Sequence, residues 1–188
     1  SWGPTVANRV PIHASGPYAT KDYRAYSIAV HTTAPPPGAF RGVGVPQSAV
    51  AQECAFDLLA EKLGMDRLAF RRLNALKNGI PTVTGQVFNS GVGIDDCFAA
   101  LEDSWHNAVA SAASFNQTAI SDDSPWRRGV GIASCWYGCG NTSLPNPSTM
   151  RFGITTDGRI VLHQGAMDIG QGANTVITQI AADALGVP

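Results

Sequence analysis

The amino-acid sequence predicts an α+β fold of two units, with mixed or antiparallel sheets and packed helices. Apolar residues recur mainly at helical spacing up to residue 114 and mainly in short strand-like runs after residue 128. A polar stretch, FNQTAISDDSP, separates these regions at 115–125. We therefore expect a helical first unit with an N-terminal strand at 1–114, a linker at 115–127 and a second unit at 128–188.

The first unit is expected to begin irregularly over 1–22 and to continue with a strand over 23–30, where YRAYSIAV is aromatic and β-branched. A helix follows from Pro46 to about Leu63, and Gly64 is a natural stop. Asp66 can cap a second helix over 67–77, and a third helix is expected from Asp95 to about Ser114. The apolar residues expected to face inward on these helices are Val50, Cys54, Leu58, Leu59, Leu73, Leu76, Phe98, Leu101, Trp105 and Val109.

The second unit is expected to open with a strand over 129–136. A hairpin should follow at 150–163, because Asp157 and Gly158 form a dipeptide that tolerates positive φ. A glycine-rich loop, GAMDIGQGANT, then occupies 165–175. A last helix should begin at Asn174 and bury its apolar positions, which are Val176, Ile177, Ile180 and Ala184.

The composition excludes several classes of protein. No run of about 18 apolar residues occurs, so no transmembrane segment is predicted. A formal net charge of −1 gives no electrostatic footprint for nucleic acid. Charged residues are only 14% of the chain. This deficit favours a surface covered by another subunit, domain or large cofactor, with a neutral Ser/Thr/Asn-rich surface as the alternative.

The four cysteines show no zinc-binding spacing. Cys135 and Cys139 lack a histidine partner, so no metal site is predicted. Cys54 and Cys97 fall on apolar helix faces and are expected to be buried thiols. Such usage favours a reducing compartment, so we expect a cytoplasmic protein, with the periplasm as the alternative.

The loop at 165–175 lies between a predicted strand and a predicted helix. Gly165, Gly170 and Gly172 allow close backbone approach to a ligand, and amides at a helix start favour an acceptor-rich group. Gln171 can both donate and accept. The loop lacks the Gly-x-Gly-x-x-Gly pattern and the lysine of a phosphate-binding loop. A tight strand-to-helix turn capped by Asn174 is the structural alternative.

A second loop, GAFRGVG at 38–44, presents Arg41 between apolar residues. A guanidinium offers five donors in a fixed fork, which suits an oxo group, a carboxylate or a phosphate. The alternative is an arginine that pairs with a nearby carboxylate or caps carbonyls. Glu53, on the helix that follows, could face this arginine, but solvation or structural pairing is the favoured interpretation.

Taken together, these segments resemble the large subunit of the molybdenum hydroxylases, the family of xanthine dehydrogenase and aldehyde oxidase. The resembling segments are PPPGAFRGVGVPQ (35–47), GMDRLAFRRLN (64–74), TGQVFNSG (84–91), RGVGIA (128–133) and GAMDIGQGANTVITQIAADALGVP (165–188). The resemblance implies part of a molybdopterin-binding α+β subunit. Arg41, Phe40 and Val43 would then orient the substrate or the oxo ligand of molybdenum. The implied cofactor contacts are Gly42, Gly170, Gln171, Gly172, Ala173 and Thr175.

The resemblance also implies hydroxylation of an aldehyde or N-heteroaromatic carbon, with water as the oxygen source. The base glutamate of the family has no match in this sequence, so no catalytic residue is assigned. Iron–sulfur clusters, with FAD as a further candidate, would lie on other subunits or domains. The implied partners are the remaining part of the molybdopterin subunit, an iron–sulfur electron-transfer subunit and a small-molecule substrate. The alternative is a non-catalytic assembly module of the same fold without cofactor.

Overall fold

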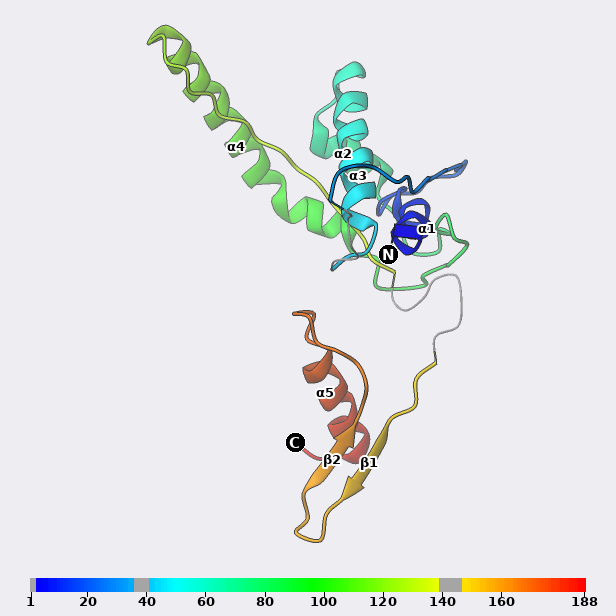
Figure 1. Ribbon diagram of the computed structural model, residues 1–188. Helices are drawn as coiled ribbons and strands as arrows, with labels where there is room; N and C mark the ends of the chain where they lie inside the picture. Colours follow the sequence, from blue (N-terminus) through cyan, green and yellow to red (C-terminus); the bar gives the residue numbers. More distant parts are fainter. Residues whose placement is uncertain (1–2, 36–40, 139–146) are drawn as a thin grey trace. The chain divides into compact units, whose positions relative to one another are not determined.

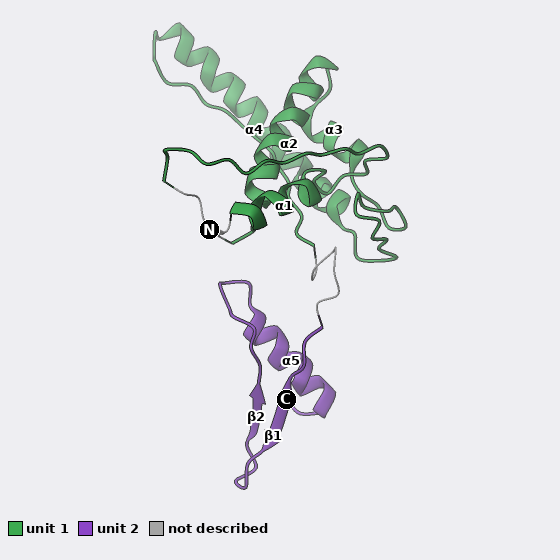
Figure 2. Cartoon of the chain, turned by 45° about the vertical axis from the view of Figure 1, so that its right-hand side comes forward, with its two compact units in different colours: residues 1–143 green, residues 144–188 purple. Residues whose placement is uncertain are grey.

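A computed structural model describes residues 3–35, 41–138 and 147–188 of the chain. The chain divides into two compact units, Ser1–Ser143 and Leu144–Pro188 (Figure 2). The first contains helices α1 to α4, and the second contains strands β1 and β2 and helix α5 (Figure 1). The predicted α+β class is therefore confirmed. Within the described residues, no helix is long and apolar enough to cross a membrane.

Helix α1 (Gly3–His13) occupies a segment that was expected to be irregular. Pro4 lies in its first turn, where a missing N–H costs nothing. The helix packs against the start of α2 (Val45–Lys62), and its end is fixed by His13. The His13 ring is buried and stacks on Tyr137 at a centroid distance of 5.3 Å. The expectation of an irregular segment was wrong because the helix is stabilised by contacts with residues distant in the sequence, which a local pattern does not reveal.

The inward face of α2 is not the apolar face that its periodicity predicts. Its buried residues are Val45, Ser48, Glu53 and Ala60. The predicted core positions lie outward, with Val50 and Leu58 each 67% exposed. Cys54 and Cys97 are also exposed, which contradicts their interpretation as buried thiols. The prediction failed because the inner side of α2 combines the ion pair and hydrogen bonds of Glu53 with packing by Val45, Phe56 and Ala60.

Helices α3 (Arg67–Asn74) and α4 (Ile94–Ser121) complete the first unit. As predicted, Asp66 caps α3, since its carboxylate accepts the Ala69 N–H at 2.9 Å. Leu76 is buried, whereas Leu73 is 70% exposed and was wrongly placed inward. Phe98 and Trp105 face inward as predicted, whereas Leu101 and Val109 lie outward. The central cluster consists of Tyr18, Leu68, Ala75, Phe98 and Trp105.

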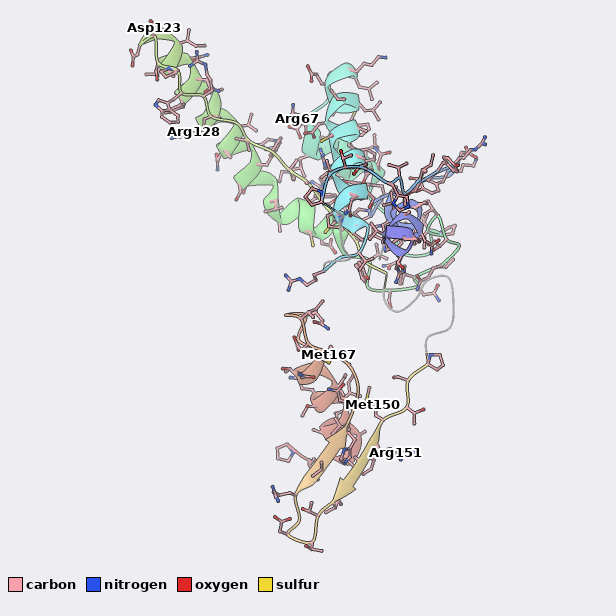
Figure 3. The ribbon with its side chains drawn as sticks, viewed as in Figure 1. Arg67, Asp123, Arg128, Met150, Arg151 and Met167 are labelled. Carbon is pink, nitrogen blue, oxygen red and sulfur yellow. The ribbon has the colours of Figure 1, made fainter. Side chains whose placement is uncertain are left out.

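Helix α4 continues to Ser121, beyond its expected end at Ser114 and into the expected linker at 115–127. The Asn116 side chain bonds both the backbone N–H and the carbonyl of Arg128, at 2.7 and 2.9 Å. The Arg128 guanidinium lies 4.2 Å from the centroid of the Phe115 ring. Figure 3 labels Arg128 beside this helix. The polar stretch is therefore largely a solvated helix face, and the division of the chain into two compact units falls between Ser143 and Leu144.

Two predicted strands are extended but have no partner strand among the described residues. Segment 23–30 lies outward, with Tyr26 87% exposed. Segment 129–136 shows the alternation of a strand: Val130 and Ile132 pack against the central cluster, whereas Gly129, Gly131 and Ala133 are exposed. Both segments are extended as predicted, but neither is a β-strand, because a strand requires a neighbouring strand for its backbone hydrogen bonds.

In the second unit, the predicted hairpin is confirmed. Strands β1 (Arg151–Ile154) and β2 (Ile160–His163) are antiparallel, with Phe152 opposite Leu162. Gly158 has φ of 82° in the turn between them. Helix α5 (Ala173–Leu185) follows the glycine-rich loop, as expected. No residue of β1, β2 or α5 is buried, so the apolar positions predicted to be inward on α5 lie outward or half-buried.

Candidate functional site

The arginine loop is a turn at 41–44 that leads directly into α2. Gly42 and Gly44 have φ of 98° and 80°, a region that residues with a Cβ rarely occupy. The Val45 N–H donates to the Gly42 carbonyl at 2.9 Å, which joins the turn to the helix. Arg41 is exposed and Val43 is half-buried. Phe40 lies outside the described residues.

Gly44 also lies in close contact with α1. A Cβ at this position would lie 2.8 Å from the Arg9 Cβ, 2.9 Å from the Val6 carbonyl oxygen and 3.0 Å from the Val10 nitrogen. Two of these three atoms belong to the backbone of α1, which cannot rotate away. Glycine is therefore required here both by φ and by the available space, and the arginine loop packs directly against α1.

The glycine-rich loop precedes α5 in a similar manner. Gly170 and Gly172 have φ of 99° and 78°, and Gly172 is the N-cap of the helix. The Asp168 carboxylate accepts the N–H groups of Gly170 at 2.8 Å and Asn174 at 3.3 Å. These amides hold the pKa of the Asp168 carboxyl below its usual value. The loop therefore supplies its own anion to amides that were expected to face a ligand.

Gln171 is exposed and bonded within the same loop. Its carboxamide oxygen accepts the Ile169 N–H at 2.7 Å, and its Nε2 donates to the Met167 carbonyl at 2.8 Å. One hydrogen of Nε2 remains beyond that bond, because an amide nitrogen carries two. Asn174 accepts a hydrogen bond from Gln164 at 2.8 Å and does not serve as the side-chain cap of α5. Figure 3 labels Met167 at this loop.

The structure thus groups the predicted residues at two loop-to-helix junctions. Arg41, Gly42 and Val43 share the junction at α2, and Gly170, Gln171, Gly172, Ala173 and Thr175 share the junction at α5. Each junction has two positive-φ glycines, two residues apart, immediately before a helix. That both junctions contact one bound group stays a prediction.

A buried polar network around Glu53 was not found as a site from the sequence. Its Oε1 accepts the hydroxyls of Tyr18 at 2.8 Å and Ser134 at 3.1 Å, and its Oε2 accepts the Arg71 Nε at 2.8 Å. Arg71 is fully buried and also contacts Asp57 at 2.8 Å. Burial, followed by the Glu53 charge, raises the pKa of the Tyr18 hydroxyl, whereas the bond to Ser134 opposes this rise. Structural pairing of Glu53 is thus confirmed, and no local pattern could have identified the network, because the partners of Glu53 lie 18 to 81 positions away.

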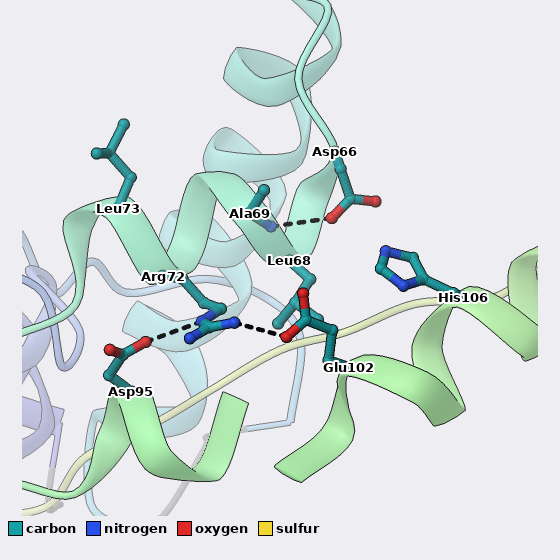
Figure 4. Close-up of a pocket in the computed structure, with 8 residues that line it drawn as sticks. All are labelled: Asp66, Leu68, Ala69, Arg72, Leu73, Asp95, Glu102 and His106. Atoms are coloured by element: carbon teal, nitrogen blue, oxygen red, sulfur yellow. Dashed lines mark hydrogen bonds and ion pairs between the residues drawn. The ribbon is translucent and has the colours of Figure 1, made fainter. Parts of the chain in front are cut away.

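A surface pocket of about 430 Å³ lies between α3 and α4 (Figure 4). Arg72 crosses it, with Nε 2.9 Å from Asp95 and one terminal nitrogen 2.7 Å from Glu102. Trp105 donates its indole N–H to Asp66 at 2.8 Å. The Arg72 guanidinium is thus neutralised by the Asp95 and Glu102 carboxylates, and these ion pairs connect α3 to α4. Among the described residues, no group of three or more His, Cys, Asp or Glu side chains could hold a metal ion.

Both junction regions lie within matches to a known protein family. Two family models, each described as "Molybdopterin cofactor-binding domain", match residues 1–75 and 99–188. The nicotinate dehydrogenase large molybdopterin subunit of Eubacterium barkeri is 44% identical over 94 residues, which are 50% of this chain and 22% of the relative. The aldehyde oxidoreductase of Megalodesulfovibrio gigas is 38% identical over 150 residues, 78% of this chain and 15% of the relative.

Among solved structures, the aldehyde oxidoreductase from Desulfovibrio desulfuricans superposes with a TM-score of 0.55 and 27% identity. The match covers 60% of this chain and 12% of that structure. The chain therefore spans less than a quarter of the length of these relatives.

Proposed function

Because the chain belongs to the molybdopterin cofactor-binding family of xanthine dehydrogenases and aldehyde oxidoreductases, we propose that it forms part of the wall of a molybdenum-cofactor site in a larger hydroxylase. The observation that carries this proposal is the position of the two glycine junctions. The first lies within the match at 1–75 and the second within the match at 99–188.

The chemistry of the two junctions fits such a group. A pterin with a phosphate is rich in acceptors, and these junctions offer a guanidinium, backbone amides and a carboxamide. Asp168 already accepts the Gly170 and Asn174 amides, so the loop holds its shape without a ligand. The donors proposed for the cofactor are therefore the second Nε2 hydrogen of Gln171 and the hydroxyl of Thr175.

The proposed roles follow from these chemical properties. Gly42, Gly170, Gly172 and Ala173 have no side chain beyond a methyl, so the backbone can approach the cofactor closely. Gln171 and Thr175 would bind its polar edge. Arg41 would orient the substrate or an oxo group on the metal, with Phe40 and Val43 forming the adjacent wall.

The bound cofactor would supply a metal centre that activates water for hydroxylation of an aldehyde or N-heteroaromatic carbon. This chain would contribute orientation by Arg41 and exclusion of water by its apolar neighbours. Val43 is smaller than an aromatic residue and leaves room beside the substrate. The catalytic base, the iron–sulfur clusters and any FAD would be supplied by other parts of the enzyme.

The exposed apolar surfaces support partners for this chain. Val50 and Leu58 on α2 are each 67% exposed, and Ile180 on α5 is 63% exposed. Exposed apolar faces of this kind are typical of surfaces that pack against another chain or domain. We propose that they pack against the remaining part of a molybdopterin subunit, with an iron–sulfur subunit receiving the electrons.

The test compares two variants of the full-length protein, purified with its subunits. Arg41→Ala should lower the rate of substrate oxidation by at least tenfold while the molybdenum content stays within twofold of the wild type. Gln171→Ala should lower the molybdenum and pterin content itself. Ser121→Ala, whose hydroxyl bonds only within α4, is the control. If both variants keep full activity and cofactor content, the chain is a non-catalytic assembly module instead.

A further inference from the structure

We propose that Glu53 is a positioning residue for the arginine loop: its buried carboxylate fixes the orientation of α2, and the turn that carries Arg41 leads directly into α2. This inference rests on the proposed function for the role of Arg41. The role of Glu53 in orienting α2 is inferred from the geometry of its hydrogen-bond network.

The first step is that four distant segments meet at one carboxylate. Glu53 belongs to α2 and Arg71 to α3, whereas Tyr18 and Ser134 come from two extended segments. The distances from the Glu53 carboxylate to its donors are 2.8 Å for Tyr18, 2.8 Å for Arg71 and 3.1 Å for Ser134. Glu53 is 6% exposed. Hydrogen bonds to a charged group are short and strong, so this point of α2 is held from three directions.

The second step is that Tyr18 and Arg71 are themselves fixed. Tyr18 is buried in the central cluster, and its ring also packs on Phe56 of α2 at a centroid distance of 4.3 Å. The backbone beside it bonds the end of α3, since the Ala19 N–H donates to the Asn74 carbonyl at 2.9 Å. Arg71 also donates to the Glu53 carbonyl at 3.1 Å and to the Arg67 carbonyl at 3.1 Å. The carboxylate is therefore attached to a rigid frame.

The third step is geometric. The start of α2 packs against the α1 backbone at Gly44, and the direction of the helix is set further along the chain, where α2 contacts α3 and Glu53 binds its donors. Glu53 lies about 14 Å further along the axis, at a rise of about 1.5 Å per residue. A tilt of about 4° over that length would displace the start of α2 by ~1 Å, and a misplacement of ~1 Å can cost ~10²-fold in rate. Because the Val45 N–H bonds the Gly42 carbonyl, the arginine turn follows the helix.

The test removes the hydroxyl donors while leaving the ion pair intact. Tyr18→Phe/Ser134→Ala keeps the Phe56 contact and the Arg71 bond, so the protein should fold. The matched control is Tyr137→Phe/Ser121→Ala, because it removes the same two atoms away from Glu53. Hydrogen–deuterium exchange of the full-length protein follows the amides of 42–48 and, for comparison, those of α4. No bound cofactor is needed for this measurement.

We expect amides of 42–48 to exchange about tenfold faster or more in Tyr18→Phe/Ser134→Ala, because each bond to a charged acceptor contributes substantially to local stability. The α4 amides and the control variant should be unchanged. In Tyr18→Phe/Ser134→Thr, which restores a hydroxyl, most of the protection should return. Unchanged exchange at 42–48, or equal acceleration in 42–48 and α4, would overturn the proposal.

A second measurement separates positioning from cofactor binding. In molybdenum-loaded protein, Tyr18→Phe/Ser134→Ala should lower kcat about tenfold or more with KM within twofold, because the substrate still binds but Arg41 is misplaced. A loss confined to KM would overturn the positioning role. Absence of molybdenum from the wild-type protein would instead count against the proposed function and leave the exchange result unaffected.

Discussion

Gly44→Ala offers a direct test of the junction that supports Arg41. The substitution would place a Cβ within 3.0 Å of two α1 backbone atoms, the Val6 oxygen and the Val10 nitrogen. It would also impose φ of 80° on an L residue, a conformation that costs ~1–2 kcal/mol. Overpacking of a close contact typically adds ~1–3 kcal/mol. We therefore expect a loss of ~2–5 kcal/mol in the free energy of unfolding.

Gly64→Ala is the matched control, because Gly64 has φ of 64° and no atom lies within 4 Å of the place that an added methyl would occupy. It should cost only the conformational ~1–2 kcal/mol. Urea denaturation of both variants, with equal m-values, gives the difference between them. If the two variants lose the same free energy, the close packing of α1 against the arginine loop is not a real constraint and the reasoning fails.

Three further predictions concern the first unit. Burial lowers the pKa of His13, so the free energy of unfolding should be greatest above the unfolded-state pKa of about 6.5. It should fall as the pH drops toward the folded-state pKa of His13. The variant His13→Gln should show a weaker dependence of the unfolding free energy on pH, measured by urea titrations between pH 5 and 7. Arg71→Met leaves the buried Glu53 charge without its ionic partner and should cost ~3–5 kcal/mol. Adding Glu53→Gln should recover part of that loss, which a double-mutant cycle measures; strict additivity would contradict the pairing. Leu68 is 1% exposed, so Leu68→Ala should lower the free energy of unfolding by ~2–5 kcal/mol. Leu73 is 70% exposed, so Leu73→Ala should change it by less than ~0.5 kcal/mol. Equal shifts in the melting temperature of the two variants would contradict the observed packing of α3.

Local signals in the sequence predicted much of the fold. Asp66 caps α3, Gly64 follows α2 in a left-handed conformation, and Asp157 and Gly158 lie in a hairpin turn. Each of these depends on a few neighbouring residues, so a short pattern is sufficient to predict it. The two glycine junctions were found for the same reason.

Long-range pairing could not be predicted in this way. Glu53 and Arg71 lie 18 positions apart, and their ion pair turns the polar side of α2 inward. The helical period of Val50, Cys54 and Leu58 is real, but those residues lie outward in this chain. Hydropathy identifies a stripe on a helix and does not identify which surface will cover it.

The internal bonds of the glycine-rich loop were hidden for a related reason. Asp168 and Gln171 bond amides and carbonyls only a few positions away. Those bonds occur in a backbone with positive φ at Gly170 and Gly172, a conformation that the sequence permits without requiring it. The residue types therefore predicted donors at this junction, whereas the folded backbone determined which of them are already occupied.

Molybdenum and pterin analysis of the full-length protein, purified from molybdate-fed cells, tests the central claim most directly. We predict about one molybdenum and one pterin per molecule in the wild type, and a marked loss of both in Gln171→Ala with the fold intact. A folded wild-type protein that contains neither molybdenum nor pterin would contradict the assignment of these loops to a molybdenum-cofactor site.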